Sequence, residues 1–371
     1  MKKILFLIPT LGHGGAEKVL VNLVNNMDRT QWDITVQTLF DEGVNKQYLK
    51  PDVHYKSFMK HQFHGNSVLL AHIPAKWLYR RIVRDRYDIL VSYLEGPTVH
   101  IVAGCPFADT KKVAWIHIEL GDDRKYSVGF ASKKAATAGY LGMDNIVCVS
   151  ETVKEVFEKT AGIAFPHIEV LYNTNETAQI LEKAKERIDD VTFRSDEVNI
   201  ISVAKLMHSK GYDRLAAVHR RLMDEGLRHH IYILGVGEDR EKLERYLAEH
   251  QLQDSFTFLG YRDNPYKYVA AADLYVCSSR REGFSTAVTE ALIVGTPVVS
   301  TCCSGAYELL GKNNEYGIVT ANSEEGIYEG MKAMLSDPAL LADYAAKAAE
   351  RGKEFSTEKT IRAVEEMLMS L

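Results

Sequence analysis

The stretch REGFSTAVTEALIVGTPVVS, residues 281–300, predicts a short helix that leads directly into a buried strand. Ser285 or Thr286 can cap this helix, and Gly295 can end it before Pro297 opens the apolar strand PVVS. A helix that feeds an apolar strand is the repeating unit of α/β proteins, in which helices cover both faces of a parallel sheet. The stretch therefore indicates an α/β fold.

The same stretch places two carboxylates, Glu282 and Glu290, in largely apolar sequence. Burying a carboxylate without a partner is costly, so something must compensate for it. Glu282 lies in the loop before the helix, where Gly283 lets backbone amides approach a ligand and the helix N-terminus favours an anion. These features together indicate a site for a hydroxyl-rich, phosphorylated ligand. The alternative is that Glu290 caps a neighbouring loop and Glu282 is an ordinary surface acid.

The composition is that of a globular protein. A length of 371 residues exceeds a single typical core, so two domains are expected. The chain is 46% hydrophobic and 26% charged, and its net charge of −5 gives no support for nucleic acid as a partner. The N-terminal MKKILFLIPT has a short apolar run before Pro9, which predicts a first buried strand rather than a signal peptide.

The cysteines indicate a reducing compartment. There are five, an odd number, and none has the paired C-x-x-C spacing of a zinc site. We therefore expect a cytoplasmic protein without a metal site.

Short apolar runs alternate with helix-like segments in both halves of the chain. The first half contains KILFLIP, DITVQTL, YDILVSY, KKVAWIH and NIVCVS, and the second contains VNIISVA, HIYILGVG, FTFLG, LYVCSS and PVVST. Such runs predict parallel sheets covered on both faces, one sheet in each half. The charged segment 174–197 is predicted as a linker. We expect domains at residues 1–173 and 198–355, and a C-terminal helix at 356–371.

Ligands of doubly wound sheets bind in the loops that follow the strands. Gly14 and Gly15 follow the first strand, where glycines let backbone amides cradle a phosphate or a sugar. The loop fails as a dinucleotide fingerprint, because Glu17 occupies the third glycine position. A plain tight turn is the alternative.

Three further side chains follow predicted strands. Lys205 and Lys210 come after VNIISVA, where two ammonium groups can neutralise a diphosphate. Solvated surface lysines are the alternative. His117 ends the run KKVAWIH, and it is either a cleft histidine or a satisfied core histidine.

These elements, in this order, resemble the retaining nucleotide-sugar glycosyltransferases of family 4. The resemblance covers nearly the whole chain and centres on EGFSTAVTE followed by GTPVVST, together with KLMHSKGYDRL, ILGVGEDREKLE, FLGYRDN and AADLYVCSSRREGF. It implies the GT-B fold, in which two Rossmann-like, doubly wound domains face each other across a cleft. The N-terminal domain would bind the acceptor and the C-terminal domain the nucleotide sugar.

The resemblance also implies roles for individual residues. Glu290 would bind the ribose hydroxyls, Lys205 and Lys210 the diphosphate, and His117 would face the donor sugar. One departure is that family members commonly have arginine where this chain has Lys205, and lysine lacks the bidentate fork of arginine. The catalytic set would be His117, Glu282, Lys205 and Lys210, and the binding set Gly14, Gly15, Gly237, Tyr261, Arg262, Gly283, Phe284, Ser285 and Glu290.

The activity implied is retaining transfer of a hexose or N-acetylhexosamine from a nucleotide diphosphate sugar. UDP is favoured over GDP, and no cofactor or metal is expected beyond the donor substrate. The acceptor would be a glycan or lipid-linked glycan in bacterial lipopolysaccharide, capsule or exopolysaccharide assembly. Two alternatives are a non-catalytic nucleotide-sugar-binding subunit and a nicotinamide-dependent oxidoreductase that uses Asp41 as its ribose acid.

The segment AKWLYRRIVRDR, residues 75–86, interleaves basic and apolar side chains. As a helix it would place Leu78, Ile82 and Val83 on one face with Trp77 at its margin, a pattern typical of a helix in a membrane interface. This predicts a protein held peripherally on the inner leaflet of the cell membrane, where a lipid-linked acceptor is found. The alternative is a basic surface helix packed on the first sheet.

Overall fold

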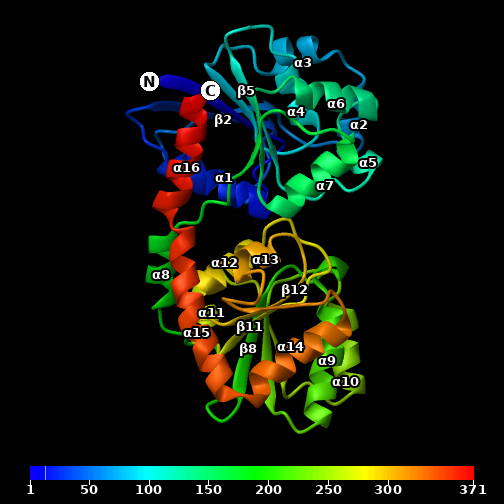
Figure 1. Cartoon of the computed structure of the whole chain (residues 1–371), viewed down its shortest axis with the longest axis vertical. Coiled ribbons are helices and arrows are strands. Elements are labelled where there is room, and N and C mark those ends of the chain that lie inside the picture. The colour runs from blue at the N-terminus through cyan, green and yellow to red at the C-terminus, as the bar shows by residue number, and fades with distance from the viewer. Residues whose placement is uncertain (13) are drawn as a thin grey trace. The chain divides into compact units, whose positions relative to one another are not determined.

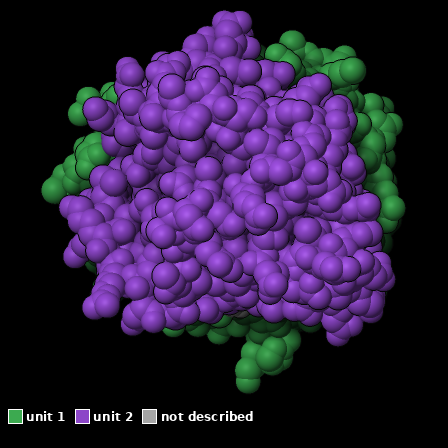
Figure 2. Space-filling model, turned by 90° about the horizontal axis from the view of Figure 1, so that it is seen from below, with its two compact units in different colours: residues 1–175, 357–371 green, residues 176–356 purple. Residues whose placement is uncertain are grey.

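The computed structural model describes residues 1–12 and 14–371. The chain forms two compact units, drawn as ribbons in Figure 1 and in separate colours in Figure 2. Unit 1 comprises Met1–Asn175 and Thr357–Leu371, and unit 2 comprises Glu176–Ser356. The segment predicted as a linker contains a helix, α8 (Thr177–Ala184).

Unit 1 is built on a parallel sheet of seven strands in the order β3-β2-β1-β4-β5-β6-β7. The order runs outward in one direction from β1 to β3 and in the other from β4 to β7. The point between β1 and β4 is therefore the topological switch point of a doubly wound sheet. The strands are β1 (Lys2–Ile8), β2 (Trp32–Phe40), β3 (His54–Met59), β4 (Ile89–Ser92), β5 (Lys111–Ile116), β6 (Asn145–Cys148) and β7 (Ile168–Val170).

Helices cover both faces of this sheet. Figure 1 shows α4, α6 and α7 on one side and α1 and α16 on the other. Serines cap two of them, since the Ser132 and Ser150 hydroxyls accept from backbone amides in the first turns of α6 and α7. The helical segments are α1 (Gly15–Asn26), η1 (Val44–Tyr48), α2 (Asn66–Ala71), α3 (Ala75–Ile82), α4 (Pro97–Ala103), α5 (Asp123–Tyr126), α6 (Lys133–Leu141), α7 (Glu151–Ala161) and α16 (Thr357–Ser370).

Unit 2 repeats the architecture with six parallel strands in the order β10-β9-β8-β11-β12-β13, which places its switch point between β8 and β11. Its core joins residues of β8, β9 and β11 to α9 (Tyr212–Asp224) and α14 (Glu324–Ser336). The strands are β8 (Val198–Val203), β9 (His229–Leu234), β10 (Phe256–Gly260), β11 (Leu274–Cys277), β12 (Val298–Thr301) and β13 (Ile318–Thr320).

The helices of unit 2 also lie on both faces of its sheet. Figure 1 shows α9, α10 and α14 on one side and α11, α12 and α15 on the other. Besides α8, the helical segments are η2 (His208–Lys210), α9 (Tyr212–Asp224), α10 (Arg240–Glu249), α11 (Tyr266–Ala271), α12 (Thr286–Ile293), α13 (Ala306–Leu310), α14 (Glu324–Ser336), α15 (Pro338–Gly352) and η3 (Lys353–Phe355).

The predicted fold class is confirmed, and each apolar run predicted as a strand contains one. Three strands were not predicted from the sequence: β3, β7 and β13. Each is the last strand at an edge of its sheet. An edge strand is covered less completely than a central one, so its sequence need not be continuously apolar.

Candidate functional site

The candidate site of unit 2 lies at its switch point, where the loops after β8 and β11 begin. The side chains of Lys210 and Glu282, one from each loop, form an ion pair with 2.7 Å between Nζ and Oε1. Both are largely covered, with 23% and 15% of their side chains exposed. The structure therefore brings together two residues, 72 positions apart in the chain, that the sequence analysis assigned to one site.

Two neighbouring serines hold these loops in place. The Ser279 hydroxyl donates to Glu282 Oε1 at 2.6 Å, so this oxygen accepts from both a serine and a lysine. The Ser278 hydroxyl donates to the backbone carbonyl of Lys210 at 2.8 Å. Neither serine was predicted as a site residue from the sequence, although both lie in the segment CSSRREGF, which is part of the family resemblance.

A second ion pair joins the same loop to helix α9. The Arg280 guanidinium donates to both carboxylate oxygens of Asp213 at 2.7 Å, and this contact lowers the pKa of Asp213. The backbone amide of Arg280 also donates to the carbonyl of Ser209. A bidentate arginine fixes direction as well as distance. The loop that carries Glu282 is thus anchored at two points.

Glu290 lies within α12 and is 8% exposed. Its Oε1 accepts from the Tyr266 hydroxyl at 3.4 Å. The helix begins as predicted, because the Ser285 hydroxyl accepts from the amide of Val288, and it ends before Gly295, whose φ is +82°. A carboxylate is therefore buried within the helix, past its first turn, with the Tyr266 hydroxyl as a hydrogen-bond donor.

The other residues of unit 2 that were predicted to bind the donor are in different settings. Lys205 is exposed. A Cβ at Gly237 would meet the backbone of Leu206 at 2.1 Å, so glycine is required there for close packing of two loops. Tyr261 is exposed, and Arg262 pairs with Asp190 at 2.9 Å.

Phe284 and Gly283 complete the loop before α12. Phe284 is buried and packs against Phe355, with 6.2 Å between ring centroids. Gly305 lies beneath it with φ of +77°, and a Cβ there would meet the Phe284 ring at 2.8 Å. Phe284 thus anchors the loop that leads from Glu282 into α12.

In unit 1, the glycine loop follows β1 as predicted. Gly14 is the N-cap of α1, and Gly15 is its first residue. A Cβ on Gly14 would meet the carboxylate of Glu17 at 2.0 Å, so this acid folds back over the start of the helix. A carboxylate already lies where the sequence analysis placed a phosphate or a sugar.

His117 follows β5 and is 7% exposed. Burial lowers its pKa to about 3, so the ring is neutral near pH 7. It packs against Tyr93 and Trp115, with ring centroids 4.9 Å and 6.4 Å away. Among the described residues, its buried Nε2 has no hydrogen-bond partner. The backbone amide of His117 donates to Glu95 Oε2 at 3.0 Å.

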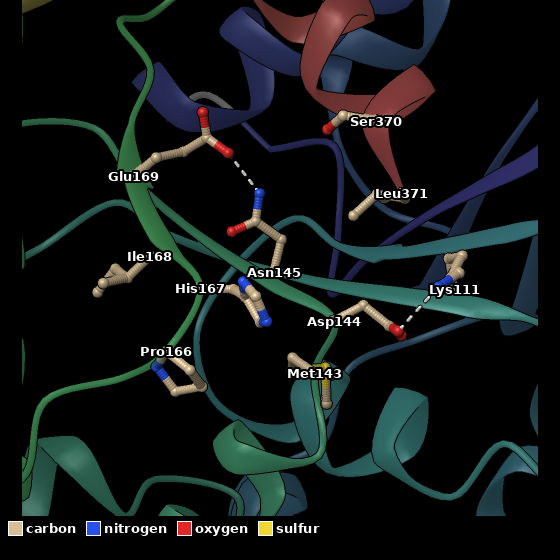
Figure 3. A pocket seen from close by; sticks show the side chains of 10 residues that line it. All are labelled: Lys111, Met143, Asp144, Asn145, Pro166, His167, Ile168, Glu169, Ser370 and Leu371. Carbon is tan, nitrogen blue, oxygen red and sulfur yellow. Dashed lines mark hydrogen bonds and ion pairs between the residues drawn. The ribbon is translucent and has the colours of Figure 1, made fainter.

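Unit 1 also contains two polar hollows, both at the opposite end of its sheet. One, of about 600 Å³, lies where β5, β6 and β7 begin and contains the pair Lys111 and Asp144, whose charged atoms are 3.4 Å apart (Figure 3). The other lies beside Lys3 and His54. Ligands of open α/β sheets bind beyond the carboxyl ends of the strands, so neither hollow is the candidate site.

The segment predicted to lie in a membrane interface is helical, but its apolar residues are not exposed. The first part of the segment 75–86 forms α3 (Ala75–Ile82), but Leu78, Ile82 and Val83 are 2–3% exposed and belong to the core of unit 1. The prediction that they face a membrane is wrong, because amphipathicity alone does not say what covers the apolar face. Trp77 is 56% exposed, and Lys76, Arg80, Arg81 and Arg84 are exposed as well.

None of the helices in the described part of the chain is long and apolar enough to cross a bilayer.

Comparisons with known proteins agree with this geometry. Residues 13–179 match the family model described as Glycosyltransferase Family 4, and residues 184–354 match Glycosyl transferases group 1. The chain is 26% identical over 371 residues to a Campylobacter jejuni N-acetylgalactosamine-N,N'-diacetylbacillosaminyl-diphospho-undecaprenol 4-alpha-N-acetylgalactosaminyltransferase, with 98% of each chain covered.

Two further matches extend the comparison. The lipopolysaccharide core biosynthesis glycosyltransferase LpsD of Rhizobium meliloti is 22% identical, with 94% of this chain and 92% of that protein covered. The crystal structure of Anabaena Alr3699/HepE in complex with UDP and glucose superposes with a TM-score of 0.79, at 20% identity and full coverage of both chains. That likeness shows the fold.

Proposed function

Because the chain belongs to the glycosyltransferases that combine a Family 4 domain with a group 1 domain, we propose that it is a retaining, metal-independent hexosyltransferase that uses a UDP-sugar. The sugar transferred is a hexose or N-acetylhexosamine. The acceptor is a lipid-linked glycan of a bacterial surface polysaccharide or lipopolysaccharide.

The observation that carries this proposal is the pair of Lys210 and Glu282 at the switch point of unit 2, 2.7 Å apart. The lysine supplies positive charge for a diphosphate, and the carboxylate accepts hydrogen bonds from hydroxyl groups of the sugar. Glu290 is buried in the helix that follows, α12, where it can accept from ribose hydroxyls. Together these groups suit a ligand that joins a nucleoside, a diphosphate and a sugar.

The proposed step breaks the bond between the sugar C1 and the terminal oxygen of the diphosphate. The acceptor oxygen forms its bond to C1 on the same face, and its proton passes to a phosphate oxygen of the departing UDP. Negative charge grows on the diphosphate as its bond breaks, and Lys205 and Lys210 stabilise it.

The choice of donor and acceptor draws on the relatives. The Campylobacter jejuni relative is named for transfer of an α-N-acetylgalactosaminyl group to a diphospho-undecaprenol saccharide, and the Anabaena protein was crystallised with UDP and glucose. These names support UDP over GDP and a lipid-linked acceptor. A lipid-linked acceptor also supports a peripheral position on the inner leaflet, with the exposed face of α3 as the contact.

A thermal-shift panel of UDP, GDP, ADP and NAD with their sugar conjugates tests the nucleotide. Binding stabilises the folded state according to ligand concentration over Kd, so UDP and UDP-sugars should raise the melting temperature most. Lys210→Ala should lose much of this shift, whereas Lys242→Ala, an exposed lysine of α10, should keep it. Stabilisation by NAD alone would refute the proposal.

Turnover separates an enzyme from a non-catalytic binding subunit. We expect release of UDP from UDP-glucose or UDP-N-acetylgalactosamine in the presence of octyl glycosides, at a rate unchanged by EDTA. Binding of UDP-sugars without any release of UDP would favour the non-catalytic alternative. Activity restored only by added magnesium or manganese would contradict metal independence.

A further inference from the structure

The switch point of unit 1 carries a carboxylate that the scheme above does not use. Glu95 lies in the loop between β4 and α4, and the glycine loop follows β1, the strand next to β4. Glu282 has the equivalent place in unit 2, in the loop after β11, the strand next to β8. In doubly wound sheets this is the place where a ligand is bound.

The carboxylate of Glu95 is fixed by one hydrogen bond and can accept more. Its Oε2 accepts from the backbone amide of His117 at 3.0 Å, which ties the loop after β4 to the end of β5. A carboxylate can accept about four hydrogen bonds, so acceptor capacity remains. The residue as a whole is half-buried, although its carboxyl is enclosed enough for burial to raise its pKa.

The charge around Glu95 limits what that ligand can be. Burial raises the pKa of this carboxyl, and the nearby Glu17 adds a smaller contribution in the same direction. Glu17 also lies over the start of α1, at the glycine loop. Two acids at one switch point disfavour a phosphate and favour a neutral group that donates hydrogen bonds, such as a sugar hydroxyl.

A second observation at the same strand ends points to a ligand. His117 is 7% exposed, and its buried Nε2 lacks a partner among the described residues. A buried polar atom without a partner is costly and is expected to acquire one. A neutral imidazole nitrogen that accepts suits the same kind of donor as Glu95 does, namely a hydroxyl group.

We propose that Glu95 determines acceptor specificity, by accepting hydrogen bonds from hydroxyl groups of the acceptor's terminal sugar in a subsite of unit 1. The inference rests on the proposed function and adds the residue that recognises the acceptor. The donor sugar also has hydroxyl groups, but its diphosphate is served by the lysines of unit 2, which carries its own carboxylate in Glu282. The experiment must therefore separate acceptor from donor.

Glu95→Gln is the test variant, because the amide oxygen can still accept from His117 while the charge is lost. Glu42→Gln is the matched control, since Glu42 is a half-buried acid just after β2, at the same end of the sheet, whose carboxylate also accepts from a backbone amide, that of Gln62. For each protein we would measure transfer from UDP-N-acetylgalactosamine and UDP-glucose to octyl glycosides, hydrolysis of the donor by water, and the thermal shift given by UDP.

Glu95→Gln should raise KM for the octyl glycoside by roughly tenfold to a hundredfold, the range expected for a hydrogen bond to a charged group. The ratio of transfer to hydrolysis should fall by a similar factor, while the UDP shift and KM for the donor change little. Glu42→Gln should resemble the wild type.

Three outcomes would overturn the inference: an unchanged KM for the glycoside, an equal loss of hydrolysis and transfer, or UDP-sugar consumption by the wild type that no glycoside stimulates. A wild type that binds no UDP-sugar would instead remove the proposed function itself.

Discussion

At the scale of single residues, the two acids around α12 are expected to act at different stages of the reaction. Glu290→Ala should weaken UDP binding by about tenfold or more, because a buried carboxylate that accepts from ribose is lost. Glu282→Ala should mainly lower kcat, since its carboxylate touches the sugar that reacts. Calorimetric titration with UDP and steady-state kinetics measure the two effects. Equal losses of affinity for free UDP in both variants would remove this division of roles.

Ser279 is expected to act through Glu282. Its hydroxyl donates to Glu282 Oε1 at 2.6 Å, so Ser279→Ala should let the carboxylate rotate and should lower kcat by about tenfold with little change in UDP affinity. Ser278→Ala is the matched control, because this equally buried serine donates to a backbone carbonyl instead. If both variants lose kcat to the same degree, the loss reflects general loosening of the loop after β11, and the specific role of Ser279 is contradicted.

The sequence predicted part of the candidate site because some of its residues lie in a recognisable pattern. Glu282, Glu290 and Lys210 follow strands within motifs, and the structure brings Glu282 and Lys210 into contact. Glu95 lies in YLEGPT, which is not among the segments that carry the family resemblance, and its proposed role depends on β4 being the neighbour of β1. Strand order is a long-range property that local periodicity does not encode, so this residue could not be found before the fold was known.

At the scale of elements, sequence periodicity identified central strands better than it identified edges or faces. The edge strand β3, HYKSFM, consists of exposed and half-covered residues and so lacks a continuous buried apolar run. For α3 the periodicity correctly gave an apolar stripe. It could not distinguish a protein core from a membrane as the partner of that stripe, because both are apolar.

A histidine cluster in unit 2 is expected to make stability depend on pH. His219 Nδ1 and His229 Nε2 are 2.8 Å apart in the core, and His230 lies next in β9. Burial lowers the pKa of His219 to about 2 and those of His229 and His230 to about 4. The unfolded chain, with histidine pKa values near 6.5, therefore binds more protons below that pH.

Stability should therefore be full above about pH 6.5 and should fall as the pH drops toward about 4, by roughly 1.4 kcal/mol per pH unit for each histidine. Urea unfolding at about pH 7 and about pH 5.5 measures the loss. His230→Gln can keep the hydrogen bond to Thr257. It should lose less stability than the wild type between the two pH values, by about the contribution of one histidine. A difference between wild type and variant that is the same at both pH values would contradict the assignment.

The exposed face of α3 is expected to bind anionic membranes. It carries Trp77 with several basic side chains, and each basic residue near an anionic surface contributes about 1 kcal/mol. Flotation with phosphatidylserine vesicles should show binding that falls as salt rises. The triple variant Arg80→Glu/Arg81→Glu/Arg84→Glu should lose it.

The control for this experiment is Arg228→Glu/Lys242→Glu/Arg245→Glu, which makes the same charge change at exposed positions of unit 2. It should still float with the vesicles. Wild-type protein that stays soluble at low salt would end the membrane proposal and would favour a soluble acceptor.

At the scale of the whole molecule, the chain leaves unit 1 and returns to it. Helix α16 packs against α1, and its Glu365 accepts from the backbone amide of Asp28 at 2.7 Å, although the two residues are 337 positions apart. The sequence predicted the helix but gave no sign of which unit it joins. Its buried residues Ile361, Val364 and Leu368 complete the core of unit 1.

Because each unit has its own core and only unit 2 carries the proposed nucleotide site, the two should respond separately to a core mutation and to UDP. Leu368→Ala removes a fully buried side chain from unit 1, which costs about 2–5 kcal/mol and should lower one calorimetric transition by roughly 5–15 °C. Met369→Ala, at an exposed neighbouring position, should leave that transition in place. UDP should raise the melting temperature of the other transition, because at roughly 100 times its Kd it stabilises the folded unit by about 2.7 kcal/mol. If there is a single transition and both Leu368→Ala and UDP shift it, the two units unfold together. If there are two transitions and UDP raises the one that Leu368→Ala lowers, the nucleotide binds unit 1 and the assignment of the two units is reversed.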